Sequence, residues 1–145
     1  MAGFLLDTNV VSELRKRQRV DAGVMAWILE QPDEALYLSV ATFGEIRKGI
    51  ERLRPRDARQ AAGLETWAET LESRYQSRLL DISLKIFKQW GLLQAIRPIS
   101  PIDALIAATA LHHDLTLVTR NIDDFEGLGL PVLNPFTGQS TASGQ

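Results

Sequence analysis

The chain has 145 residues, a length that fits one domain and leaves little room for a second. It has no cysteine, which excludes disulfides, zinc–thiolate sites and cysteine nucleophiles and is typical of proteins in a reducing compartment. No apolar run approaches the roughly 20 residues that span a bilayer, and no basic segment precedes the first apolar residues. We therefore expect a cytoplasmic protein without a membrane segment.

Apolar periodicity and turn residues predict strands that alternate with helices. Short apolar runs predict strands at 4–6, 36–39, 79–82, 116–119 and 130–133. Helical spacing and capping residues predict helices from 8 to 31 with a break near 19, about 43–54, 57–78, 84–96 and 101–113. The side chains of the 84–96 helix expected to face inward are Ile86, Phe87, Trp90 and Leu93. This alternation predicts an α/β sandwich around a mostly parallel sheet.

We expect one domain over residues 1–134, followed by a disordered tail. Residues 135–145 are rich in Ser, Thr, Gly and Gln, a composition that buries little apolar surface. The densest basic cluster lies near the opposite end of the chain, at Arg15, Lys16, Arg17 and Arg19. With a net charge of −2, the chain lacks the basic surplus usual in nucleic-acid binders, which favours a solvated helix end over an RNA or partner contact.

Four acidic residues fall where strands end or helices begin. Asp7 directly follows the first strand, Glu45 lies six residues beyond the second, and Asp124 lies five residues beyond Thr119. Asp103 lies in the first turn of a predicted helix. The carboxyl ends of parallel strands meet at one edge of a sheet, so we expect these acids to converge there. Crowded carboxylates repel one another, and a divalent cation such as Mg²⁺, which prefers oxygen ligands, relieves that conflict.

The same acids have simpler structural interpretations. Asp7 could cap the helix that follows it, and Asp103 could belong to a capping arrangement that begins at Ser100. Glu45 could be a solvated helix residue paired with a nearby lysine, and Asp124 could turn or cap a loop. A non-catalytic nucleic-acid-binding or interaction module, with acids that serve only as caps, therefore stays open at this point.

Four segments carry the acids in a fixed order. They are LLDTNVVSEL at 5–14, GEIRKGI at 44–50, IDALIAATA at 102–110 and VTRNIDDF at 118–125. Together they resemble the PIN domain, and specifically the VapC and FitB-like toxins of bacterial type II toxin–antitoxin systems. The resemblance implies a PIN-like three-layer α/β/α sandwich. It also implies a metal-dependent endoribonuclease that hydrolyses RNA phosphodiester bonds with water activated by Mg²⁺, or by Mn²⁺ in its place.

The resemblance also assigns roles to the acids. It implies that Asp7 and Asp103 are the principal metal ligands and that Glu45 completes the acidic pocket through a bound water. The fourth acid is expected at Asp124. Some relatives instead have an aspartate at the position that Asn121 occupies here, so both positions stay open.

Polar neighbours and partners complete the prediction. Thr8, Asn9 and Thr119 are suited to hold carboxylates or waters in place, although Thr8 and Asn9 could instead only cap the first helix. The resemblance implies an RNA substrate, a cognate antitoxin that covers the acidic groove, and a homodimer that could join a larger toxin–antitoxin assembly. The nearest alternative is a PIN nuclease of RNA processing or decay that is not a toxin.

Overall fold

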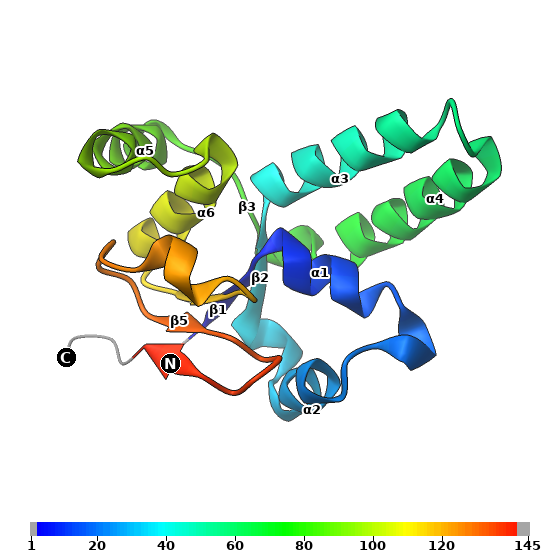
Figure 1. Cartoon of the computed structure of the whole chain (residues 1–145), viewed down its shortest axis with the longest axis horizontal. Helices are drawn as coiled ribbons and strands as arrows, with labels where there is room; N and C mark the ends of the chain where they lie inside the picture. The colour runs from blue at the N-terminus through cyan, green and yellow to red at the C-terminus, as the bar shows by residue number, and fades with distance from the viewer. Residues whose placement is uncertain (1–2, 142–145) are drawn as a thin grey trace.

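Six short strands form one sheet in the order β3-β2-β1-β4-β5-β6 within residues 3–141, the part of the chain that this computed structural model describes (Figure 1). The strands are β1 (Phe4–Leu6), β2 (Leu36–Ser39), β3 (Leu79–Leu80), β4 (Thr116–Val118), β5 (Val132–Leu133) and β6 (Ser140–Thr141). All neighbouring strands run parallel except β5 and β6, which are antiparallel. The prediction of a mostly parallel sheet is confirmed.

Helices connect the strands and begin at polar capping residues. They are α1 (Thr8–Leu14), α2 (Ala22–Glu30), α3 (Val40–Leu53), α4 (Ala58–Arg74), α5 (Leu84–Ile96) and α6 (Pro101–His112). Short 3₁₀ helices lie at η1 (Arg17–Arg19), η2 (Asp33–Ala35), η3 (Gln76–Arg78) and η4 (Ile122–Phe125). The side chains of Asp21, Ser83 and Ser100 accept hydrogen bonds from backbone N–H groups in the first turns of α2, α5 and α6. None of the helices in the described part of the chain is long and apolar enough to cross a membrane.

The sheet is buried on both faces, which produces three layers. Successive strand residues point to opposite sides, so Leu5 and Leu117 pack with α5 and α6, whereas Leu6 and Val118 pack with α1 and α2. The inner strands are therefore mostly apolar, with polar residues only at Ser39, where β2 ends, and Thr116, where β4 begins, as expected for a parallel sheet covered by helices on both faces. The three-layer α/β/α sandwich predicted from the sequence is confirmed.

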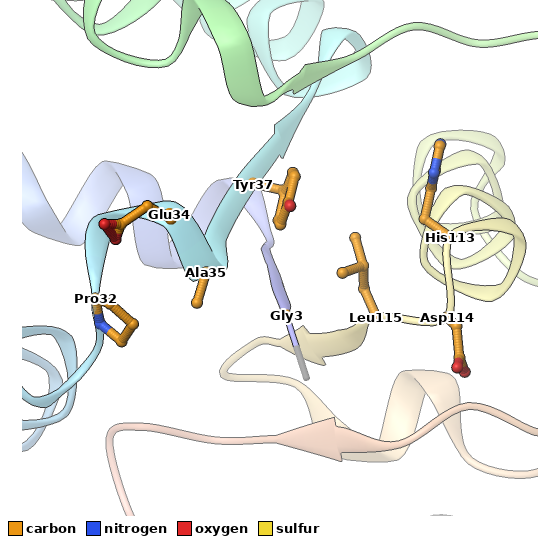
Figure 2. Close-up of a pocket in the computed structure, with 8 residues that line it drawn as sticks. All are labelled: Gly3, Pro32, Glu34, Ala35, Tyr37, His113, Asp114 and Leu115. Atoms are coloured by element: carbon orange, nitrogen blue, oxygen red, sulfur yellow. The ribbon is translucent and has the colours of Figure 1, made fainter. Parts of the chain in front are cut away.

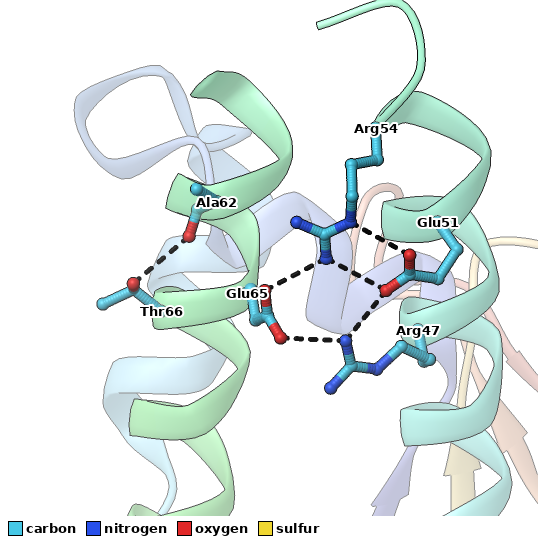
Figure 3. A network of polar contacts seen from close by, with 6 residues as sticks. All are labelled: Arg47, Glu51, Arg54, Ala62, Glu65 and Thr66. Carbon is cyan, nitrogen blue, oxygen red and sulfur yellow. Dashed lines mark hydrogen bonds and ion pairs between the residues drawn. The ribbon is translucent and has the colours of Figure 1, made fainter. Parts of the chain in front are cut away.

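Helices α3 and α4 form a hairpin that projects beyond the sheet (Figure 1). Ile50, Ala61 and Ala68 form a small apolar cluster of their own between the two helices. On the surface, Arg47 and Arg54 each pair with both Glu51 and Glu65, at 2.9–3.0 Å (Figure 3). The hairpin therefore neutralises these charges internally.

The C-terminal segment differs from the prediction of a disordered tail, since residues 135–141 are ordered. The side chain of Asn134 accepts a hydrogen bond from the Phe136 N–H at 2.9 Å, and its carbonyl oxygen accepts one from Gly138 at 2.8 Å. Gly138 has φ of +80°, a conformation that glycine adopts without a steric cost. This turn reverses the chain, so β6 pairs with β5. Residues 142–145 lie outside the described part.

A second prediction was wrong for one residue of α5. Ile86 and Leu93 are buried against α6 as expected, but Phe87 is 47% exposed. The buried stripe of α5 is narrow because the helix packs mainly against α6. Phe87 lies one position further around the helix and faces away from that contact.

Candidate active site

Asp7 is the most constrained acid of the candidate site. It leaves the carboxyl end of β1, and its side chain is 4% exposed. One carboxylate oxygen accepts the Thr8 N–H at 2.8 Å, so Asp7 does cap α1, as the simpler interpretation proposed. The other oxygen accepts a hydrogen bond from the Thr119 hydroxyl at 2.8 Å and one from the Asn9 amide at 3.3 Å. Asp7 therefore caps α1 and is itself held by Thr119, which follows β4, and by Asn9 of α1.

Thr119 orients its hydroxyl toward Asp7. The Thr119 oxygen accepts the Asn9 amide at 3.1 Å and the Asn121 backbone N–H at 3.2 Å. Because two donors already occupy its lone pairs, its single proton is left for the Asp7 carboxylate. The contacts expected of Asn9 and Thr119 are thus present, and Asn121 takes part through its backbone.

Burial and mutual repulsion raise the pKa values of two of these acids. Burial is the main cause that raises the pKa of Asp7 to about 6, and Asp103 and Glu45 add repulsion, while hydrogen bonds from Thr119 and the Thr8 backbone oppose it. The pKa of Asp103 is also raised, first by burial and then by Asp124 and Glu45. The fold therefore places Asp103 close enough to be repelled by the other three acids, and Asp7 close enough to be repelled by Glu45.

Glu45 is held by the start of α1. The Thr8 hydroxyl donates to a Glu45 carboxylate oxygen at 2.6 Å and lies 3.2 Å from the Thr42 hydroxyl. Among the residues that the structure describes, Glu45 makes no ion pair, so the expected alternative of pairing with a lysine is not found. Thr8 therefore links α1 to α3 and fixes one oxygen of Glu45.

Asp103 lies in the first turn of α6. The hydroxyl of Ser100 accepts its backbone N–H at 3.2 Å, as the capping arrangement predicted. The Ser100 hydroxyl and the Asp103 backbone N–H thus complete the cap, so the half-buried Asp103 carboxylate is not required for this role. Capping and a site role are compatible for Asp103, as they are for Asp7.

Asp124 is positioned by a residue that the sequence did not single out. The guanidinium of Arg97 donates to the backbone carbonyl of Asp124 in η4. The connection from α5 to α6 that carries Arg97 is itself held by the Trp90 indole, which donates to the Pro101 carbonyl at 3.0 Å, and by a side-chain bond from Gln94. Sequence offers no signal for Arg97, because its contact depends on a segment 27 residues away.

A cavity of about 420 Å³ lies between this connection and η4. Its lining residues are Arg97, Pro98, Ile99, Ser100, Asp103, Asp123 and Asp124. Asp103 and Asp124 therefore share one open space beside the buried Asp7. Asp7, Glu45 and Asn121 lie outside this lining.

The donor set fits a hard divalent cation. All four side chains offer carboxylate oxygens, and among the described residues none of them forms an ion pair with a lysine or an arginine. Within residues 3–141, no three acidic or histidine side chains are grouped tightly enough to enclose an ion by themselves. Mg²⁺ keeps several waters and takes one or two carboxylates directly, so a loose group of acids suits it.

A second cavity, of about 550 Å³, lies at the opposite edge of the sheet (Figure 2). It is formed where β1, β2 and β4 begin, and its lining residues are Gly3, Pro32, Glu34, Ala35, Tyr37, His113, Asp114 and Leu115. None of the four predicted acids contributes to it. The candidate site is thus defined by chemistry at the carboxyl edge rather than by the size of a cavity.

Comparisons with known proteins agree with this fold. The PIN domain family model matches residues 4–129. Plasmid stability protein StbB of Pseudomonas syringae is 38% identical, over 92% of this chain and 98% of the relative. A VapC ribonuclease of Sinorhizobium fredii is 35% identical, over 92% and 97%. The crystal structure of FitAcB from Neisseria gonorrhoeae superposes with a TM-score of 0.81 at 29% identity, over 92% of this chain and 98% of that chain.

Proposed function

Because the chain belongs to the PIN domain family, we propose that it is an endoribonuclease dependent on Mg²⁺ or Mn²⁺ and the toxin of a toxin–antitoxin pair. The observation that carries this proposal is the convergence of Asp7, Glu45, Asp103 and Asp124 at the carboxyl edge of the sheet. Its substrate is RNA, as the name of the VapC ribonuclease relative suggests. Cellular RNA would be met in the cytoplasm.

Asp7 and Asp103 would hold the cation, with Glu45 and Asp124 completing the acidic pocket. A divalent cation supplies charge stabilisation for the phosphodiester and makes water a better nucleophile. The chain itself orients the acids. Thr119 fixes Asp7, and because Thr8 occupies one oxygen of Glu45, the other remains to accept a hydrogen bond from water. Such preorganisation is what a site needs to act on a scissile bond.

A groove beside the site is suited to an inhibitory antitoxin. The structural relatives include a FitAB complex and a toxin–antitoxin complex from Klebsiella pneumoniae, and we propose that this chain likewise binds an antitoxin partner. The groove lies between α1 and the α3–α4 hairpin, has a volume of about 210 Å³, and joins apolar side chains such as Ile46, Leu64 and Trp67 to Glu45. An extended or helical antitoxin segment seated there would reach the acids. The homodimer predicted from the resemblance also stays a proposal.

Metal dependence and growth arrest test the proposal separately. The purified protein should cleave RNA with Mg²⁺ or Mn²⁺, lose cleavage in EDTA, and lose it again as the Asp7→Asn variant with the fold retained. Cleavage that persists in EDTA would refute the metal mechanism. No cleavage and no thermal shift with Mn²⁺ would favour a non-catalytic module. Growth arrest on expression, relieved by a neighbouring antitoxin gene, separates a toxin from a nuclease of RNA processing.

A further inference from the structure

Arg120 follows Thr119 directly and is fixed by its backbone on both sides. Its N–H donates to the Asn9 side-chain oxygen at 3.1 Å, and its carbonyl accepts the Asn134 amide at 3.0 Å. Asn9 and Thr119 also bond to the Asp7 carboxylate. Arg120 thus belongs to the same hydrogen-bonded frame as the candidate metal ligand, and the ordered C-terminal segment completes that frame.

The Arg120 side chain is exposed, and its guanidinium carbon lies 4.2 Å from the centroid of the Phe136 ring. Within residues 3–141 its guanidinium makes no ion pair and no hydrogen bond. Arg47 and Arg54 are different, because carboxylates neutralise both of them (Figure 3). Stacking on Phe136 limits the rotamers of Arg120 without using its N–H donors, so all five remain for a ligand.

In the described part of the chain, cations without an ion pair gather at the end of α1, and they also favour a polyanion. Helix α1 begins at the acidic site and ends in the exposed basic cluster of residues 15–19. In this cluster only Lys16 has an ion pair among the described residues, with Glu13 at 2.9 Å. Hydrogen bonds from Lys16 and the Asp21 backbone are the main causes that lower the pKa of Glu13, and the charge of Arg120 adds a smaller contribution, so Arg120 lies near this carboxyl. Unpaired cations therefore lie beyond the acids, along α1, in a chain whose net charge is −2.

We infer that Arg120, backed by Phe136, binds a backbone phosphate of single-stranded RNA next to the bond that is cut. The inference rests on the proposed ribonuclease function. A planar guanidinium offers paired donors that match phosphate oxygens, and phosphate contacts by arginine position a nucleic acid without reading its sequence. Arg120 is thus a binding residue that keeps the RNA strand in place while the acids act. The basic cluster of residues 15–19 extends the RNA-binding surface along α1.

The salt dependence of RNA binding tests this inference. A fluorescein-labelled single-stranded RNA would be titrated with the Asp7→Asn protein, which blocks cleavage, and with the same protein carrying Arg120→Gln. Loss of one charge-assisted contact should weaken binding about tenfold and lower the slope of log affinity against log salt by about 0.7. Arg56→Gln removes the same charge from the exposed turn between α3 and α4 and should change neither value.

Two more variants separate a contact from a structural effect. Arg120→Lys keeps the charge and should retain the salt slope, while Phe136→Leu removes the backing ring and should weaken binding by a smaller factor than Arg120→Gln. In the otherwise wild-type protein, Arg120→Gln should raise KM more than it lowers kcat. Binding and slope equal to those of Arg56→Gln would overturn the inference. So would unchanged RNA binding together with weakened antitoxin binding. If the unmodified protein does not cleave RNA with metal, the proposed function itself fails.

Discussion

The Asp7→Asn substitution should stabilise the protein and abolish RNA cleavage. The Asp7 carboxyl has a pKa of 3.8 when unperturbed and about 6 in the folded chain, chiefly because of burial. Between these values the folded state binds more protons than the unfolded state, so stability falls as pH rises from about 4 to about 6. Above that range the ionised carboxylate costs about 3 kcal/mol, since one pH unit corresponds to about 1.4 kcal/mol.

The Asp7→Asn variant carries no ionised group at this position and so avoids that cost. Its amide oxygen can replace the oxygen that accepts from Thr119 and Asn9, but its amide NH2 would then meet the Thr8 N–H, and one mismatched hydrogen bond costs about 1 kcal/mol. We expect a net gain of about 2 kcal/mol at neutral pH without metal. For a chain of this length the gain corresponds to an increase in Tm of roughly 4–8 °C.

Thermal unfolding in EDTA from about pH 4 to pH 8 measures this effect. The variant should have the higher Tm at neutral pH, and the difference should change sign as pH falls below the pKa of Asp7, because only the cost of the mismatched hydrogen bond then remains. Mn²⁺ should then raise the Tm of the parent and leave that of the variant unchanged. A variant that is no more stable than the parent at neutral pH, or a difference that does not depend on pH, would refute the assignment of a buried, ionised Asp7.

Two further predictions concern parts of the chain that support the site. Arg97→Gln should lower RNA cleavage about tenfold, because it releases η4. In a protein that already carries Asp124→Asn, adding Arg97→Gln should cause no further loss. Additive losses in this double-mutant cycle would show that Arg97 acts elsewhere. Gly23→Ala would place a Cβ 2.8 Å from the Pro135 carbonyl oxygen and should cost about 1–3 kcal/mol in urea unfolding. The matched control Gly63→Ala has open space in α4 and should stabilise the chain by about 0.5–1 kcal/mol, so equal effects of the two would contradict this account.

Patterns that are local in the sequence predicted most of the fold. The strand 4–6, the break near residue 19 and the start of α6 at Pro101 depend on neighbouring residues, and the structure confirms them. The acids were predictable for the same reason, because their distance from a strand end or a helix start places them at one edge of the sheet. Their roles as metal ligands remain predictions.

Contacts between distant segments were not predictable. Arg97 reaches Asp124 across 27 positions, and Arg120 is fixed by Asn9 across 111. The polar composition of residues 135–141 indicated disorder, yet the Asn134 turn and the pairing of β6 with β5 order this segment. The composition of a segment indicates how much apolar surface it can bury. It does not indicate whether the segment can form backbone hydrogen bonds with the edge of a sheet formed by other parts of the chain.

The antiparallel course of β6 also determines where the described chain ends. β5 runs toward the carboxyl edge of the sheet and β6 runs back, so Thr141 pairs with Val132 and lies, like Gly3, at the edge away from the acids. A surface anchor or a fluorophore attached beyond either of these positions would leave the acids and Arg120 facing the solution. Immobilised protein should therefore bind RNA as freely as protein in solution, which makes single-molecule observation of individual cleavage events practicable.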